Sequence, residues 1–400
     1  MSIISDINIQ ILLDSSGKPG LCVRFTTENG QSEACISVCH TEPSSLALKS
    51  LSVPSFVHGL QAYIQHAKSS VIPHLIGIST TDQIQFDAYL HEIDGTELFS
   101  QIGPDIARAL SYANAHSAAK EYNIPLYRHL GGMYAGDIPL PFVQIPMSAS
   151  AKDAAGNALN TAFQPMFQPV LTPMHASSME DLIPAIASVY EVAPLQISAT
   201  KEMDGIKSVE AGLEEIHSIC AQILEDCQVT MQPGLICRHT SFDSEKEEYY
   251  LGNTAYAREN YIQHLTELVQ AYDIFYLESP LWGRDSEGYA LLTSEIGATT
   301  LVANATWQTA SGPRPHIQDV LTSTNSMVID PCTLGTISDI YDMTKRAKNH
   351  GLETIIGSAL SADPTSAHIG CAFGCIGIQL GQNGQGIQTF NELIRIEESL

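Results

Sequence analysis

The sequence has 400 residues, of which 44% are hydrophobic and 16% are charged. This length exceeds one typical domain, and the apolar content suffices for a core, so we expect one large domain and one smaller one. Acidic residues outnumber lysine and arginine by 44 to 19, which gives a formal net charge of −25. This charge argues against nucleic acid and anionic membranes as partners, because binding to them needs clustered lysine and arginine. It is compatible with a basic protein partner.

The N-terminal stretch MSIISDINIQILLDSSG has no basic segment and no long apolar run, so we expect no secretory signal. No segment approaches the ~20 apolar residues that a membrane span needs. The nine cysteines include no C-x-x-C motif. We expect them to be reduced core residues, with a disulfide or metal site as the alternative. These features predict a soluble, cytoplasmic protein.

Three strands are predicted in the first forty residues. INIQILLD and LCVRFTT alternate in polarity around the turn SSGKPG, and SEACISV follows the turn ENGQ. From about residue 45 to 125 the pattern becomes helical. SFVHGLQAYIQHAK and PDIARALSYANAHSAAKEYN place apolar residues at i, i+3, i+4 and i+7. A three-stranded meander followed by helices predicts a compact α+β domain.

The Gly/Pro-rich segment GGMYAGDIPLP marks the expected domain boundary, which gives domains 1–134 and 135–400. Beyond it, short apolar runs such as CQVTMQPGL, YDIFYLESP, ATTLVANA, NSMVIDP and LETIIGS alternate with amphipathic segments such as IQHLTELVQAY. Regular alternation of strand and helix predicts a parallel sheet. Over a segment of this length, a closed β/α barrel is favoured over an open sheet.

Polar residues follow three of these apolar runs. Glu278, Asn304 and Asp330 are separated by 26 residues each time, which is the length of one βα unit. We therefore expect them on adjacent strands at the C-terminal mouth of the barrel, where barrel enzymes carry their chemistry. Glu278 and Asp330 could alternatively be polar caps of strand ends, each hydrogen-bonded to a neighbouring loop.

Several segments, in the same order along the chain, resemble enolase. They are ILLDSSGKPG (Ile11 to Gly20), the helical segment from Ile93 to Gly132, IPLPFVQ, YLESPL, IDPCTLGTISD and the terminal FNELIRIEESL. The resemblance implies an N-terminal capping domain and an eight-stranded, TIM-like barrel. It also implies dehydration of 2-phosphoglycerate to phosphoenolpyruvate with two magnesium ions, and dimer formation.

The functional residues that the resemblance implies are mostly replaced. Of three carboxylates expected around a magnesium ion, only Glu278 is present, and Gly234 and Asn304 fall at the other positions. Mg²⁺ prefers anionic oxygen ligands, so this set is a poor one. The lid that carries the second metal corresponds to VCHTE, from Val38 to Glu42.

The expected catalytic groups are replaced as well. The general-base lysine corresponds to Asp330, which cannot act as a lysine does and adds negative charge beside an anionic substrate. The other degenerate positions are Ala199 for the acid/base glutamate (with Glu202 as an alternative if the loop is shifted), Gln168 for a further glutamate, Ser358 to Ser361 for the phosphate-binding loop, and Thr389 for a second lysine.

These replacements predict a non-catalytic enolase-fold protein with a structural, binding or assembly role and no cofactor. Its expected partner is a protein: another copy of this chain, a true enolase or a third protein. Ser16 and Ser399 replace charged residues of the family's dimer surface, so the oligomeric state stays open.

Two alternative functions remain. The first is an enzyme of altered chemistry, in which a cation or cationic substrate is surrounded by Glu278, Ser279, Asn304, Asp330 and His239. The second is an active phosphopyruvate hydratase. Separately, the segment CRHTSFDSEKEEYYLGNTAYARENY predicts a surface loop, with Tyr249, Tyr250 and Tyr256 as a possible contact patch.

Overall fold

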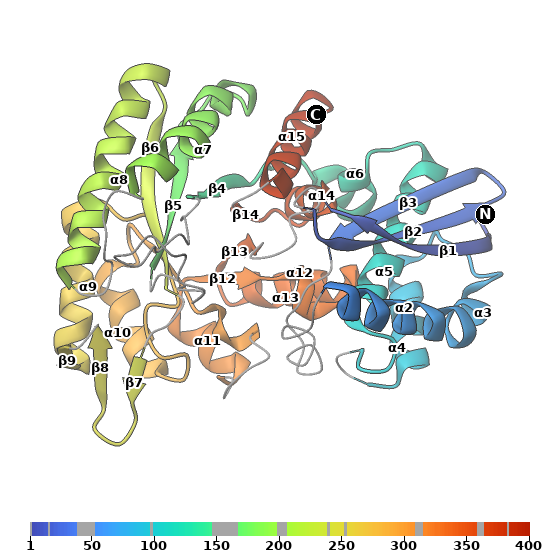
Figure 1. Ribbon diagram of the computed structural model, residues 1–400, viewed down its shortest axis with the longest axis horizontal. Coiled ribbons are helices and arrows are strands. Elements are labelled where there is room, and N and C mark those ends of the chain that lie inside the picture. Colours follow the sequence, from blue (N-terminus) through green and yellow to red (C-terminus); the bar gives the residue numbers. More distant parts are fainter. Residues whose placement is uncertain are drawn as a thin grey trace.

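The computed structural model has two parts, an N-terminal one on the right of Figure 1 and a barrel on the left. It describes residues 2–14, 17–37, 53–96, 99–145, 167–197, 206–237, 241–251, 254–308, 315–357, 364–381 and 384–400. The expected boundary between residues 134 and 135 falls between the last helical turn of the first part and the first barrel strand.

The N-terminal sheet is the expected antiparallel meander, in the order β1 (Ile4–Leu13), β2 (Pro19–Thr27) and β3 (Gly30–Ser37). Alternate residues of its strands, such as Val23 and Phe25, are buried against helix α5. The helices of this part are α2 (Val53–Ser70), α3 (Ile72–Leu75), α4 (Gln83–Asp94), α5 (Pro104–Tyr122), α6 (Leu126–Gly131) and the 3₁₀ turn η2 (Gly132–Tyr134).

Helix α5 connects the two parts of the molecule. It begins at Pro104, whose missing N–H costs nothing in a first turn, and ends before Asn123, which adopts a left-handed conformation (φ 52°). Most of its residues are buried, and many are alanine or serine. These small side chains let α5 pack on β2 and β3 and also on helices α12 and α13 of the barrel.

Eight strands close into a barrel, in the order β10-β11-β12-β13-β14-β4-β5-β6. Their bounds are β4 (Leu140–Gln144), β5 (Phe167–Met174), β6 (Thr230–Cys237), β10 (Tyr276–Glu278), β11 (Leu301–Ala303), β12 (Ser326–Ile329), β13 (Glu353–Ile356) and β14 (Gly377–Leu380). The barrel interior is filled by Phe142, Val170, Ile236, Tyr276, Ala303, Val328 and Ile355.

The barrel is not wholly parallel, which corrects the expectation of a parallel sheet. β5 runs antiparallel to both of its neighbours, β4 and β6. Two helices, α7 (Ile183–Ile197) and α8 (Ile206–Cys227), pack against each other between β5 and β6. One helix between two strands runs back along the sheet, so the next strand is parallel to the first. Here two antiparallel helices follow β5, the second helix runs in the direction of β5, and β6 therefore runs opposite to β5.

The remaining helices and turns surround the barrel. They are η3 (Glu180–Leu182), α9 (Arg258–Tyr272), α10 (Ser286–Ile296), η4 (Ala305–Gln308), α11 (Ile317–Ser323), α12 (Pro331–Leu334), α13 (Ile337–Asn349), α14 (Pro364–Ala372) and α15 (Gly384–Glu398). Helix α13 packs on β12 and β13 on one side and on α4 of the N-terminal part on the other.

The tyrosine-rich segment forms a small sheet of β7 (Ser241–Asp243), β8 (Glu248–Leu251) and β9 (Thr254–Ala257). Tyr249 is fully buried, stacks on Tyr261 with 4.7 Å between ring centroids, and donates a hydrogen bond to Asp285. The expected contact patch is therefore wrong for Tyr249. Alternation within the short strand β8 turns this side chain inward, while Tyr250 is only partly buried.

The structure bears on two further expectations, the absence of a membrane span and the reduced state of the cysteines. Among the described residues, no helix is both long and apolar enough to cross a membrane. Cys332 is disulfide-bonded, contrary to the expectation that all cysteines are reduced. The other described cysteines are free.

Candidate functional site at the barrel mouth

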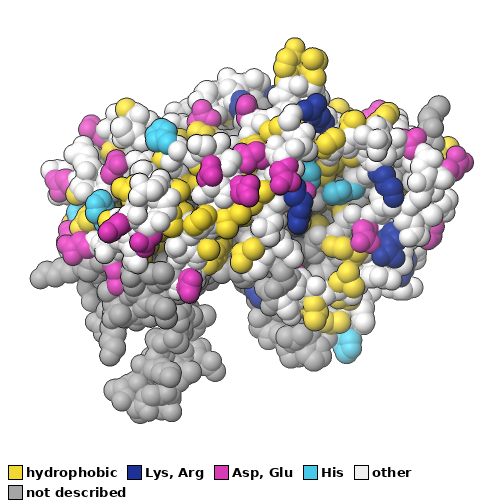
Figure 2. Space-filling model, turned by 90° about the horizontal axis from the view of Figure 1, so that it is seen from above, with side chains coloured by type: hydrophobic (Ala, Val, Ile, Leu, Met, Phe, Trp, Pro, Cys, Tyr) yellow, Lys and Arg dark blue, Asp and Glu magenta, His cyan; other side chains and the backbone are white. Residues whose placement is uncertain are grey.

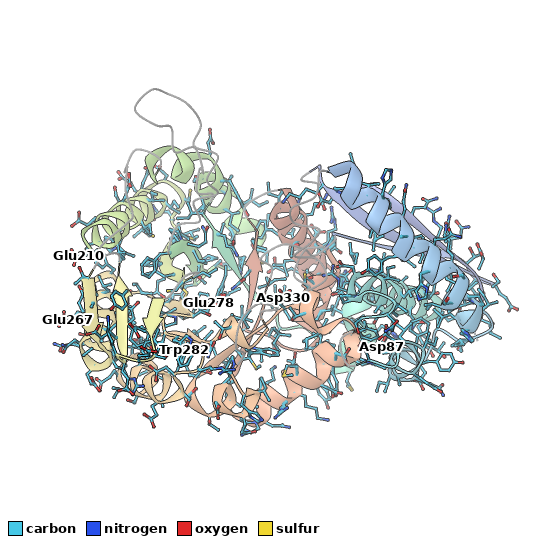
Figure 3. The ribbon with its side chains drawn as sticks, turned by 60° about the horizontal axis from the view of Figure 1, so that its bottom comes forward. Asp87, Glu210, Glu267, Glu278, Trp282 and Asp330 are labelled. Atoms are coloured by element: carbon cyan, nitrogen blue, oxygen red, sulfur yellow. The ribbon has the colours of Figure 1, made fainter. Side chains whose placement is uncertain are left out.

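Glu278, Asn304 and Asp330 lie where the spacing predicted, at the ends of three adjacent strands. Glu278 is the last residue of β10, Asn304 directly follows β11, and Asp330 directly follows β12. Figure 3 shows Glu278 and Asp330 among the side chains of the barrel. The three residues nevertheless make different contacts with the described parts of the chain.

Two neutral donors among the described residues bind the Glu278 carboxylate. Its Oε2 atom accepts a hydrogen bond of 2.5 Å from the Tyr276 hydroxyl and one of 2.6 Å from Nε2 of Gln379. Gln379 also donates to the Tyr276 hydroxyl over 3.1 Å. Glu278 is only 8% exposed, and a buried carboxylate requires such donors. The pKa of Tyr276 is held well above its usual value, mainly by burial and to a lesser extent by the charge of Glu278. The Tyr276 hydroxyl therefore stays protonated and can donate.

Strand register corrects the expected alignment of β6. Glu278 lies beside Ile236, whereas Gly234 lies beside Tyr276, one layer deeper in the barrel. A Cβ atom on Gly234 would lie 2.9 Å from the Cβ of Tyr276, closer than such atoms pack. Gly234 therefore makes room for Tyr276, and the strand position next to Glu278 belongs to an isoleucine that is 6% exposed. Sequence alignment without the register placed the glycine there instead.

Asn304 and Ser279 hold the loops that follow β11 and β10. The Asn304 amide donates to the carbonyl of Gly283 over 2.9 Å, and its Oδ1 accepts from the Thr306 hydroxyl over 2.6 Å. The Ser279 hydroxyl accepts from the backbone N–H of Ala305 over 3.0 Å. Both polar ends of the Asn304 side chain are thus engaged by the loops.

Asp330 caps helix α12. Its Oδ1 accepts from the backbone N–H of Cys332 over 2.9 Å, in the manner of an N-cap residue. Burial raises the pKa of the Asp330 carboxyl, and the Cys332 N–H and the Arg108 guanidinium oppose that rise. Arg108 is itself buried and paired with Asp105 over 2.9 Å. The hydrogen bond from the Cys332 N–H is of the kind that a strand-end cap makes.

Three glutamines complete the inner surface near Glu278. Gln168 pairs with Ile236 in the sheet and donates to the carbonyl of Ile145 over 2.6 Å. Gln144, on β4, is 2% exposed, and its Nε2 has no hydrogen-bond partner among the described residues. Gln379, on β14, was missed by sequence reasoning. The apolar run around GIQL could have marked it as the inward residue of the last strand.

The other expected site residues are not brought to this mouth. Thr389 lies within helix α15, fully buried, and not at a strand end. The last barrel strand carries Gln379 instead, so the terminal helix was mistaken for the end of that strand. Ala199, Glu202, His239, Ser358 to Ser361 and Val38 to Glu42 lie outside the described residues.

The described residues of this mouth do not match the Mg²⁺ site that the resemblance implies. Mg²⁺ requires a near-octahedral set of oxygen ligands, mostly anionic ones. The strand positions beside Glu278 are occupied by two apolar residues, Ile236 on β6 and Ala303 on β11. The Asn304 amide is engaged by the neighbouring loops. Among the described residues, one group of three possible metal ligands has its ligand atoms within 4.8 Å of one another, and it lies on β2 and β3. These are Cys22, Glu33 and Cys35, where Arg24 already pairs with Glu33.

The fold and site together define a class: a strand-and-helix domain beside an eight-stranded β/α barrel with one buried glutamate at its mouth. Comparison with known proteins agrees. Residues 4–130 match the model of the enolase N-terminal domain, and residues 239–400 match that of the enolase C-terminal TIM barrel domain. The chain belongs to the enolase family.

Curated relatives named enolase match over the whole chain. That of Methanosphaera stadtmanae is 31% identical over 424 residues, with 100% of this chain and 98% of the relative covered. That of Methanothermobacter thermautotrophicus is 30% identical over 422 residues, covering 100% and 97%. That of Methanocorpusculum labreanum is 30% identical over 415 residues, with both chains covered fully. Identity at this level establishes the family and the fold.

Proposed function

We propose that this protein is a non-catalytic member of the enolase family that serves a binding or assembly role. The observation that carries the proposal is the state of Glu278. Its carboxylate is bound by Tyr276 and Gln379, and its neighbour on β6 is Ile236. A metal ion at this position would have to displace two buried hydrogen bonds and would gain no carboxylate from β6. We therefore propose that Mg²⁺ binding has been lost.

The charge at the position of the general base supports the same conclusion. Asp330 stands where a lysine is implied, and its carboxylate caps α12. Against an anionic substrate, a carboxylate at ~4 Å contributes repulsion of about 4 kcal/mol at an effective dielectric constant near 20. Loss of one preorganised electrostatic donor typically costs ~100- to 1000-fold in rate. Loss of the general base and of the metal ligands together supports an inactive site.

The surface supports a protein as the partner. Figure 2 shows acidic side chains spread over much of the face seen from above, with few lysines and arginines among them. Net charge of this size keeps a protein soluble and disfavours polyanionic partners. A second copy of this chain and a true enolase are the partners that retention of the family fold suggests.

One observation favours the alternative of altered chemistry. Within the described part of the chain, the buried Nε2 of Gln144 lacks a hydrogen-bond partner, and buried polar groups of this kind are rare. A small ligand in the mouth that accepts from this amide would satisfy it. The alternative of altered chemistry assigns such a ligand to the mouth that carries Glu278 and Asp330.

Turnover of 2-phosphoglycerate in the presence of Mg²⁺ tests the proposal. Phosphoenolpyruvate formation is followed by absorbance, with the enolase of Methanosphaera stadtmanae as the positive control. We expect no turnover above the uncatalysed rate. Turnover comparable with the control would establish a phosphopyruvate hydratase and refute the proposal. Native mass spectrometry of the purified protein tests for a small ligand that would favour altered chemistry.

A further inference from the structure

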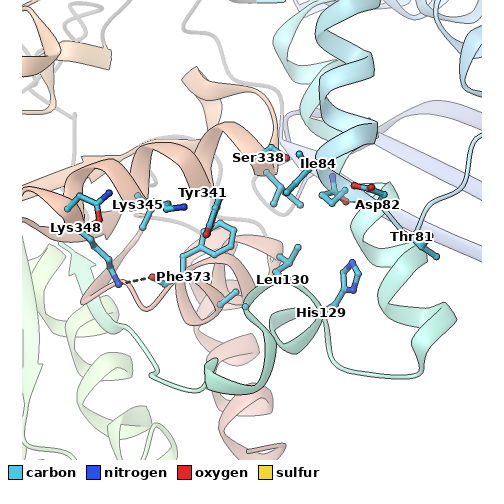
Figure 4. Close-up of a pocket in the computed structure, with 16 residues that line it drawn as sticks. Thr81, Asp82, Ile84, His129, Leu130, Ser338, Tyr341, Lys345, Lys348 and Phe373 are labelled. Atoms are coloured by element: carbon cyan, nitrogen blue, oxygen red, sulfur yellow. Dashed lines mark hydrogen bonds between the residues drawn. The ribbon is translucent and has the colours of Figure 1, made fainter.

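A groove lies between the N-terminal part and the barrel, along α13. It has a volume of about 910 Å³, and its walls come from the start of α4, from α6, from the outer face of α13 and from the end of α14. Figure 4 shows these elements around the opening. We call it the α4–α13 groove.

The middle of the groove is apolar and aromatic. Tyr341 projects from α13 toward Phe373, with 5.3 Å between ring centroids in an edge-on arrangement, and Leu130 faces them from α6 (Figure 4). Ile84, at the start of α4, is 70% exposed, and Tyr341 is 40% exposed. Water-exposed apolar side chains gathered in a concave surface are typical of binding sites.

One end of the groove is cationic. Lys345 and Lys348 lie one turn apart on α13, and both are exposed. The Lys345 ammonium lies 5.6 Å from the ring centroid of Tyr341. Lys348 donates to the carbonyls of Phe373 and Gly374 over 2.8 and 2.5 Å, which fixes its position and leaves one of its three donors. Within the described residues, neither ammonium forms an ion pair with a carboxylate of this chain.

The charge of the groove is unusual for this protein. The chain carries more than twice as many acidic residues as lysines and arginines, yet the groove is lined by two lysines and by one carboxylate, Asp82. The Asp82 carboxylate accepts from the backbone N–H of Gln85 over 3.0 Å and so caps α4. Among the residues that line the groove, the two lysine charges are therefore matched by no free carboxylate.

We propose that the α4–α13 groove binds an acidic peptide segment of a partner protein, with an apolar side chain seated on Tyr341 and Phe373 and carboxylates at Lys345 and Lys348. Charge complementarity selects an acidic occupant, and the aromatic wall selects one that also carries an apolar anchor. This inference deepens the proposed binding role by naming the chemistry of the partner. It does not depend on the barrel mouth, because the groove shares no residue with that site.

Fluorescence anisotropy tests the proposal with the full-length protein. The probe is the fluorescein-labelled peptide Glu-Glu-Leu-Phe-Glu-Glu, and its controls are Lys-Lys-Leu-Phe-Lys-Lys and Glu-Glu-Ser-Ser-Glu-Glu. We expect binding of the first peptide and much weaker binding of both controls. Binding should weaken as salt rises from low to physiological concentration, because the charges are exposed. Equal binding of the acidic and basic peptides would overturn the proposal.

Matched variants separate the groove from the general surface charge. The double variant K345E/K348E is expected to weaken binding on the order of tenfold or more, and Tyr341→Ala is expected to weaken it as well. Lys68→Glu changes an exposed lysine of α2 and should leave the affinity unchanged. If K345E/K348E binds as wild type does, or if free glutamate or inorganic phosphate at equal ionic strength displaces the peptide, the proposal is wrong.

The experiments distinguish failure of the groove assignment from failure of the proposed non-catalytic role. Peptide binding together with turnover of 2-phosphoglycerate would refute the non-catalytic role and leave the groove assignment standing. Absence of both would refute the groove assignment and leave the non-catalytic role standing.

Discussion

The Tyr276 hydroxyl donates a 2.5 Å hydrogen bond to the Glu278 carboxylate two residues further along the same strand. Residues two apart on a strand point to the same face, so both side chains lie inside the barrel. The Tyr276 hydroxyl therefore satisfies part of the hydrogen-bonding capacity of the buried Glu278 carboxylate. This relationship predicts how the mouth responds to substitution.

Removal of the Tyr276 hydroxyl should destabilise the fold through Glu278. Tyr276→Phe keeps the ring and deletes a hydrogen bond to a buried carboxylate, so we expect the free energy of unfolding to fall by about 1.5–3 kcal/mol. Tyr289→Phe is the matched control, since that hydroxyl donates to the neutral carbonyl of Leu281 over 3.1 Å. Its expected loss is about 0.5–1.5 kcal/mol. Urea denaturation measures both, and equal losses would show that Glu278 gives the Tyr276 bond no added strength.

Gly234 should tolerate no side chain. Gly234→Ala places a methyl group 2.9 Å from the Cβ of Tyr276, and overpacking of this kind costs about 1–3 kcal/mol. Gly136→Ala is the control, because the nearest atom there is the flexible Cδ2 of Leu400 at 3.3 Å. Thermal denaturation should show a clear loss for the first variant and little change for the second. A wild-type melting temperature for Gly234→Ala would mean that Tyr276 is not held against β6.

The small β7–β9 sheet should depend on Tyr249 as a core residue. Tyr249 is buried and donates to Asp285 over 2.6 Å, and Arg258 pairs with the same carboxylate over 3.0 Å. We expect Tyr249→Ala to lower the free energy of unfolding by about 3–5 kcal/mol. Tyr250→Ala, at a partly exposed position, should cost less than about 1 kcal/mol. Comparable, small effects of the two variants would restore the interpretation of a tyrosine contact patch.

The junction between the two parts should respond to pH through Asp87. This carboxyl lies on α4 with no exposed surface and accepts from the Ser338 hydroxyl over 2.7 Å and from the Ser338 N–H over 3.0 Å. Burial raises its pKa from 3.8 to about 6, against the opposing effect of these hydrogen bonds. Figure 3 shows its place beside the barrel.

A raised pKa of an acid means that the folded state binds the proton more tightly than the unfolded state. The stabilisation from Asp87 is therefore fully present below pH ~4 and is lost as pH rises through about 6. Relative to Asp87→Asn, wild type should lose on the order of 3 kcal/mol over this interval. Ser338→Ala removes a donor and should extend the loss to higher pH. Denaturation curves at stepped pH measure this, and a constant difference between wild type and Asp87→Asn would contradict it.

The sequence located the site better than it described the contacts there. The interval of 26 residues placed Glu278, Asn304 and Asp330 at adjacent strand ends, because one βα unit has a nearly constant length. The alternating strands of the N-terminal meander and the helical periodicity of α2 and α5 were equally visible. These features depend on local periodicity, which a single sequence contains.

What the sequence did not reveal depends on pairing between distant segments. Whether Gly234 or Ile236 stands beside Glu278 is decided by the register of β6 against β10. The antiparallel direction of β5 follows from two helices in succession, and the contact of Gln379 with Glu278 joins residues about one hundred positions apart. None of these leaves a pattern within one short window of the chain.

Calorimetric titration with Mg²⁺ tests the central claim most directly, namely that the mouth around Glu278 does not form a metal site. The matched variant I236D/Y276F/A303D supplies carboxylates at the two strand positions beside Glu278 and removes the hydroxyl that binds it. We expect no saturable heat from wild type and saturable binding by the variant, with a Mg²⁺-dependent rise in melting temperature for the variant alone. Saturable Mg²⁺ binding by wild type that is abolished in Glu278→Gln would contradict the account.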